Sequence, residues 1–96
     1  MYEELFELEI VSPEKLLFAG QVELVTLPGA KAPFTVLYNH APLVSTLCAG
    51  KIIWKVGKDK QEMSIQSGFV EVKENKVTAC VEVDLKVKSE KLKRKG

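Results

Sequence analysis

Apolar and polar residues alternate with a period of two along most of this chain, and no other feature restricts the fold as strongly. Successive side chains of a β-strand point to opposite faces of a sheet, so the alternation predicts strands with one buried face. Near the start of the chain the apolar positions are Phe6, Leu8 and Ile10, with glutamates between them. Near its end they are Val77, Ala79, Val81, Val83 and Leu85.

Turn-forming residues interrupt the alternation at short intervals and predict where strands end. They are Ser12-Pro13-Glu14-Lys15, Gly20, Pro28-Gly29, Ala49-Gly50, Gly57-Lys58-Asp59-Lys60 and Glu74-Asn75. Roughly eight or nine short strands result, and no helical pattern precedes Lys86. The sequence therefore predicts an all-β fold, an antiparallel β-sandwich or flattened barrel.

The length of 96 residues suits one domain, which we expect to span residues 1–88 and to precede a short basic tail at residues 89–96. The net charge is only +1, so the chain lacks the basic surface of a nucleic-acid-binding protein. No apolar run approaches the roughly eighteen residues of a membrane span. Any association with a membrane is therefore expected to be indirect.

The sequence offers no group of residues suited to catalysis, to a cofactor or to a metal ion. His40 is the only histidine, and Cys48 and Cys80 do not have the sequence spacing of metal ligands. The two cysteines are expected to be free thiols in a reducing cytosol. Most acidic residues occupy the outward phase of alternating strands, and Trp54 is expected to pack in the core rather than to stack on a base. We therefore predict a non-catalytic protein.

The segment Asn39-His40-Ala41-Pro42-Leu43 has the composition of a rigid surface loop. Pro42 fixes its own φ angle and favours an extended Ala41. Asn39 is one of the few non-glycine residues that tolerate a left-handed backbone. A loop of fixed shape that displays one imidazole is suited to docking on a partner.

These motifs resemble the epsilon subunit of the F-type ATP synthase. The resemblance runs from about Leu5 to Leu85. It rests on the following features in order: Pro13 after an Ile-Val strand, Phe18-Ala19-Gly20-Gln21-Val22, His40-Ala41-Pro42-Leu43, Gly50, Ser67-Gly68-Phe69-Val70-Glu71-Val72 and Asn75-Lys76-Val77-Thr78. It implies a β-sandwich of about ten short strands at the foot of the rotating central stalk. There a non-catalytic subunit would link gamma to the c-ring and couple proton-driven rotation to ATP synthesis.

The resemblance also implies two interfaces. The surface facing gamma would include Ser12, His40, Ala41, Pro42 and Leu43. The end facing the c-ring would be Gly29, Ala30, Lys31, Ala32 and Pro33. Two positions depart from the family pattern. The ring-facing loop is commonly richer in glycine and carries an acidic residue, whereas this one has Lys31 and Pro33. Position 39, usually glycine, is Asn39.

Most bacterial members continue into a C-terminal helical hairpin, whereas this sequence ends after a short basic segment. The resemblance is therefore to a short form that lacks the hairpin. It implies a peripheral protein on the cytoplasmic face of the bacterial plasma membrane, without a cofactor and monomeric when isolated. The alternative is a free-standing β-sandwich module that recognises another protein or a carbohydrate.

Overall fold

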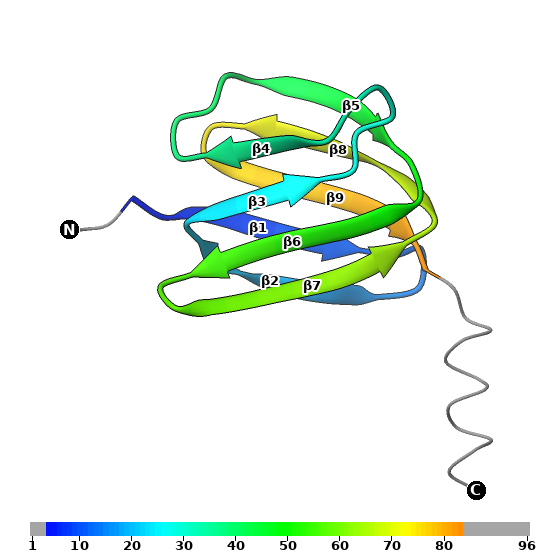
Figure 1. Cartoon of the computed structure of the whole chain (residues 1–96), viewed down its shortest axis with the longest axis horizontal. Helices are drawn as coiled ribbons and strands as arrows, with labels where there is room; N and C mark the ends of the chain where they lie inside the picture. Colours follow the sequence, from blue (N-terminus) through cyan, green and yellow to red (C-terminus); the bar gives the residue numbers. More distant parts are fainter. Residues whose placement is uncertain (1–3, 84–96) are drawn as a thin grey trace, which may run out of the picture.

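The computed structural model describes residues 4–83, which form nine strands and contain no helix. The strands are β1 (Phe6–Val11), β2 (Leu16–Val22), β3 (Leu24–Leu27), β4 (Phe34–Leu37), β5 (Leu43–Leu47), β6 (Gly50–Val56), β7 (Asp59–Ile65), β8 (Ser67–Lys73) and β9 (Lys76–Glu82). They form two facing layers (Figure 1). The five-stranded sheet has the order β2-β1-β9-β8-β5, and the four-stranded sheet has the order β4-β3-β6-β7. The predicted β-sandwich is confirmed.

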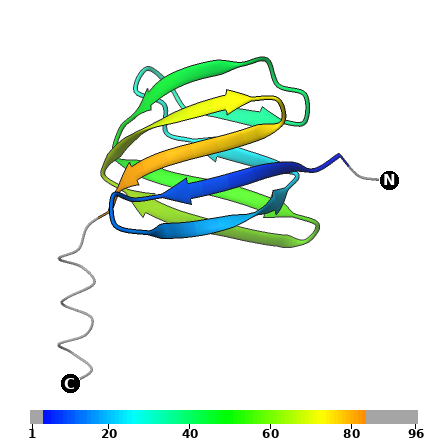
Figure 2. The same ribbon diagram turned by 180° about the vertical axis from the view of Figure 1, so that it is seen from behind.

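Neighbouring strands are antiparallel with one exception, since β1 and β9 run parallel at the centre of the five-stranded sheet. Leu8 pairs with Val77 and Ile10 with Ala79 in this register. The first and last strands of the described chain are thereby joined side by side, as Figure 2 shows from the opposite side. A parallel pair cannot be connected by a tight hairpin, and the chain between β1 and β9 accordingly passes through both sheets before β9 returns beside β1.

The core is built from the inward phase of each strand. Phe6, Leu8 and Ile10 are buried, and so are Val77, Ala79 and Val81 opposite them in the same layer. Trp54 is only 4% exposed, and its ring centroid lies 4.7 Å from that of Phe18. Trp54 is therefore a core residue, as expected. Among residues 4–83 no charged or polar side chain is buried, which spares the core the cost of desolvating such groups.

The predicted interruption of the second strand at Gly20 is wrong. Strand β2 continues through Gly20, which pairs with Leu8, and the break comes at Glu23. A Cβ atom on Gly20 would lie 3.1 Å from the Phe18 ring, so the small residue leaves room for that ring to pack on Trp54. At Glu23 the chain passes from the five-stranded to the four-stranded sheet, and Glu23 N donates to Lys55 O.

The turns have the backbone conformations that their residues favour. Glu74 and Asn75 both have positive φ angles, of 51° and 59°, as in a type I′ hairpin turn. The other hairpin turn is shorter than predicted, because Asp59 and Lys60 already belong to β7. Asn39 has a φ angle of 66°, so its predicted left-handed conformation is confirmed. The expectations for Leu85, for the boundary at residue 88, for the tail and for a missing hairpin fall outside the described residues.

We predict that Val81→Asp lowers the free energy of unfolding by roughly 3–5 kcal/mol, because it would bury an unpaired carboxylate. Val81 is 2% exposed and lies on the inward face of β9. Ser64→Asp is the control, since Ser64 is exposed on β7 opposite Lys51. Urea unfolding would measure both variants. Equal stability of the two variants would contradict the assignment of Val81 to the core.

Candidate functional site

The loops of the sandwich gather at its two ends, which lie at the left and right of Figure 1. The His40 end comprises the segment 38–42, the Gly57-Lys58 turn and the Glu74-Asn75 turn. The Gly29 end comprises the Ser12–Lys15 turn, the segment 28–33 and the Cys48-Ala49 link. Residues 4–83 hold no group of three or more histidine, cysteine or acidic side chains placed to bind a metal ion.

At the His40 end, the segment between β4 and β5 is held by backbone and side-chain hydrogen bonds. His40 N donates to Leu37 O at 3.1 Å, and His40 Nδ1 lies 2.7 Å from Ala41 O. A carbonyl oxygen can only accept, so Nδ1 carries the proton in this contact. In the neutral ring, Nε2 is then left as an acceptor at a half-exposed position.

The predicted contact residues of this loop differ in exposure. Ala41 and Pro42 are exposed, whereas Leu43 begins β5 and is partly buried against the core. The loop is also tied to the β8–β9 turn, because Asn39 N donates to Asn75 Oδ1 at 2.7 Å. Of the predicted contact residues, the loop therefore presents Ala41, Pro42 and a partly exposed His40, beside the exposed Tyr38 and Asn39, and Leu43 serves the fold as well.

At the Gly29 end, the predicted ring-facing loop is an arch fixed against β5. Gly29 forms a β-bridge with Leu47, and Ala30 N donates to Thr46 O at 3.0 Å. A Cβ atom on Gly29 would lie 2.5 Å from Ala32 O, so no larger residue fits the arch without movement of its backbone. Lys31, Ala32 and Pro33 are exposed at the top. The arch thus presents a cation on a short, fixed loop.

Ser12 does not lie near the other residues predicted to face gamma. It follows β1 at the Gly29 end, whereas Leu43 begins β5 at the His40 end on the opposite edge of the five-stranded sheet. Its hydroxyl accepts from Lys15 N at 3.2 Å and lies 3.3 Å from Lys15 O. These contacts show that Ser12 stabilises the turn between β1 and β2.

The outer face of the five-stranded sheet connects these two corners, and part of it is apolar. Phe69 is 51% exposed and Val44 is 74% exposed, although both lie within strands. Phe69 is paired with Cys80, and Cys80 with Val11. We call Val11, Val44, Thr46, Phe69 and Cys80 the outer patch; Figure 2 views the sheet from this side. Exposed apolar side chains that gather on one face are typical of a protein interface.

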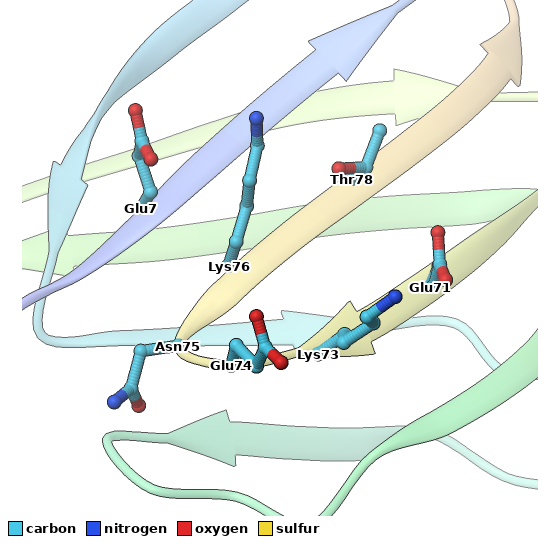
Figure 3. Close-up of a pocket in the computed structure, with 7 residues that line it drawn as sticks. All are labelled: Glu7, Glu71, Lys73, Glu74, Asn75, Lys76 and Thr78. Carbon is cyan, nitrogen blue, oxygen red and sulfur yellow. The ribbon is translucent and has the colours of Figure 1, made fainter.

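Toward the His40 end the same face is charged. A shallow depression there is lined by Glu7, Glu71, Lys73, Glu74, Asn75, Lys76 and Thr78 (Figure 3). Lys76 Nζ lies 3.8 Å from Glu9 Oε1 across the β1–β9 pair. Three glutamates and two lysines line the depression, so its formal charge is only −1 and gives little selectivity for an anionic or a cationic ligand.

Sequence reasoning did not identify the outer patch. Its signal was present in the alternation of β8, where Val70 and Val72 point inward and Phe69 has the outward phase. Val44 has the outward phase of β5 in the same way. An apolar residue in an outward phase is the feature that marks such a surface.

Comparison with known proteins gives a consistent result. Residues 5–84 match the family model described as the β-sandwich domain of the ATP synthase delta/epsilon chain. The ATP synthase epsilon chain of Leptospira borgpetersenii is 34% identical over 95% of this chain and 76% of its own length. That of Caulobacter vibrioides is 42% identical over 76% of this chain and 85% of its own length.

Two solved structures share the fold at low sequence identity. A chain in the structure of the Euglena gracilis mitochondrial ATP synthase, OSCP/F1/c-ring, has a TM-score of 0.77 and 19% identity over 98% of this chain and 65% of its own length. A chain in the central stalk/c-ring structure of the Tetrahymena thermophila enzyme has a TM-score of 0.68 and 16% identity over 79% of this chain and 62% of its own length. The present chain belongs to the ATP synthase delta/epsilon family, whose epsilon chain is a non-catalytic subunit of the enzyme.

Proposed function

We propose that this chain is a central-stalk subunit that links gamma to the membrane c-ring and couples proton-driven rotation to ATP synthesis. Membership of the delta/epsilon family supports the assignment of the chain to an ATP synthase. The loops at two separate ends of the sandwich support the role of a connector. The proposal puts the chain peripherally on the cytoplasmic face of a bacterial plasma membrane, attached through the complex. No helix among residues 4–83 is long and apolar enough to cross a membrane.

The gamma contact is proposed to run diagonally over the five-stranded sheet. It would begin at His40, Ala41 and Pro42, cross the outer patch and end near Ser12. The outer patch is the observation that carries this proposal, because it joins two corners of the sheet that otherwise lie too far apart for one compact contact. A half-exposed Phe69 in the middle would supply the apolar anchor that strong interfaces need.

The Gly29 end is proposed to face the ring. Gly29, Ala30, Lys31, Ala32 and Pro33 form the arch fixed on β5, and a ring loop would meet Lys31 first. The hydrogen bond to Thr46 and the bridge to Leu47 connect the arch directly to β5, which also carries Val44 and Thr46 of the outer patch. Strain applied at the arch would therefore reach the gamma contact through β5.

The first test is the affinity of the isolated chain for the gamma subunit of the same enzyme, measured by titration calorimetry. Val44→Asp is expected to weaken binding about tenfold or more, because it places an unpaired charge in a desolvated contact. Val44 is a better probe than Leu43, since it is 74% exposed and its replacement leaves the core intact. His40→Ala is expected to weaken binding less, about threefold, by removing one hydrogen-bonding group.

A matched pair of threonines controls for the new charge. Thr46 is exposed on the outer face of the five-stranded sheet, and Thr35 is exposed on the outer face of the four-stranded sheet. Thr46→Asp should weaken gamma binding, and Thr35→Asp should leave it unchanged. If Val44→Asp and Thr46→Asp both bind like the unaltered chain, the gamma contact lies elsewhere. If the unaltered chain ignores gamma altogether, it is a recognition module of another kind.

The second test concerns the ring. Cys48 is exposed, and its Sγ lies 3.5 Å from Pro28 O, so a photoreactive group attached there probes the Gly29 end. In the assembled enzyme, a Cys80→Ser chain labelled at Cys48 is expected to form a cross-link with the c subunit. A chain with Cys48→Ser, Cys80→Ser and Lys58→Cys carries the same group in the turn at the His40 end and should not. Capture of c by the Lys58→Cys probe alone would reverse the proposed orientation.

A further inference from the structure

We infer that the Asn75 side chain fixes the shape in which the His40 loop docks, so that a residue outside this loop helps to set the affinity for gamma. The inference rests on the proposed function, because it assumes that the loop meets gamma. The structure shows two asparagines that are hydrogen-bonded to each other, Asn39 in the segment after β4 and Asn75 in the turn between β8 and β9. We call this pair the asparagine clasp.

Two hydrogen bonds make the clasp. Asn39 N donates to Asn75 Oδ1 at 2.7 Å, and Asn75 Nδ2 donates to Asn39 Oδ1 at 3.3 Å. The two residues are 36 positions apart in the sequence. In Figure 3 the Asn75 side chain points away from Lys76 and Thr78, toward the segment between β4 and β5. Although Asn75 lines the charged depression, its side-chain hydrogen bonds are made with Asn39.

The Asn75 side of the clasp is firmly anchored. Asn75 belongs to the tight turn between β8 and β9, and its carbonyl oxygen accepts from Glu7 N at 3.0 Å. The turn is thereby bound to β1 as well as to its own two strands. The loop on the other side follows β4 of the four-stranded sheet. The clasp thus connects the two layers at the His40 end.

On the other side of the clasp, Asn39 has an unfavourable backbone conformation that the hydrogen bond to Asn75 stabilises. Its φ angle of 66° is a conformation in which non-glycine residues are uncommon. Two of the next three residues, Ala41 and Pro42, are exposed. The bond to Asn75 fixes the backbone at the point where the loop leaves β4. His40 follows directly, so the clasp sets the direction in which the imidazole is presented.

A loop held in its bound shape loses less conformational freedom when a partner docks, and this raises affinity without adding a contact. In this chain the clasp would reduce the conformational freedom that the loop loses on docking, although Asn75 itself need not touch gamma. The backbone N–H of Asn39 carries the shorter bond of the clasp, and its side chain adds only the longer one. A glycine at position 39 would adopt the same φ angle more easily and would keep the shorter bond.

Asn75→Gly is the variant that tests the inference. Glycine favours the positive φ angle of this turn position, so the hairpin should keep its fold while the clasp is removed. The affinity for gamma is expected to fall roughly three- to tenfold. The amide of Asn39 should exchange its hydrogen faster in the isolated chain, as measured by NMR, while amides in the centre of β9 stay as protected as before.

Two further variants separate the clasp from other effects. Asn39→Gly keeps the N–H that donates to Asn75 Oδ1 and relieves the left-handed strain, so its affinity should stay within about twofold of the unaltered chain. Asn75→Asp keeps an oxygen that accepts from Asn39 N, so it should recover most of the affinity lost in Asn75→Gly. Recovery by Asn75→Asp would assign the effect to the acceptor and not to the turn.

Unchanged gamma affinity in Asn75→Gly would overturn the inference, whatever happens to the Asn39 amide. An equal loss in Asn39→Gly would also overturn it, because the main clasp bond survives in that variant. If gamma does not bind the unaltered chain, the proposed function fails instead. The exchange rate of the Asn39 amide would then still show whether Asn75 holds the loop.

Discussion

The burial of alternate side chains between two sheets is the interaction on which the rest of this structure depends. The five-stranded side of the core is supplied by Phe6, Leu8, Ile10, Val22, Leu47, Val70, Val72, Val77, Ala79 and Val81. Because these strands commit one phase to the core, most outward side chains are left free of packing in the core. The protein can therefore vary its loops and outer face for partners while the sandwich stays stiff.

Stiffness is also what the proposed role requires. Nearly every described segment pairs with a neighbour, and the parallel pair β1 and β9 joins the first and last strands in the middle of a sheet. Each end has its own cross-connection, with the arch bridged to Leu47 at one end and the asparagine clasp at the other. A body tied together at both ends can transmit a load between two partners with little internal movement.

Much of the fold follows from the sequence because the period of two determines which side chains face inward. The alternation predicted the buried phases of β1 and β9 correctly, and the residue type at position 39 indicated its left-handed conformation. It missed the passage between sheets at Glu23, since that depends on how Phe18 and Trp54 pack across the sandwich. The separation of Ser12 from His40 was equally hidden, because the order of strands in a sheet is a long-range property that local patterns do not encode.

The central claim is that one stiff sandwich meets gamma with its five-stranded sheet and the ring with its Gly29 end. A cryo-EM structure of the assembled enzyme tests this most directly. The account predicts that Phe69 and Val44 are covered by gamma, that the arch from Ala30 to Pro33 lies against ring loops, and that the outer face of the four-stranded sheet is left uncovered. A structure in which gamma covers β6 and β7 while Phe69 and Val44 stay exposed would contradict it.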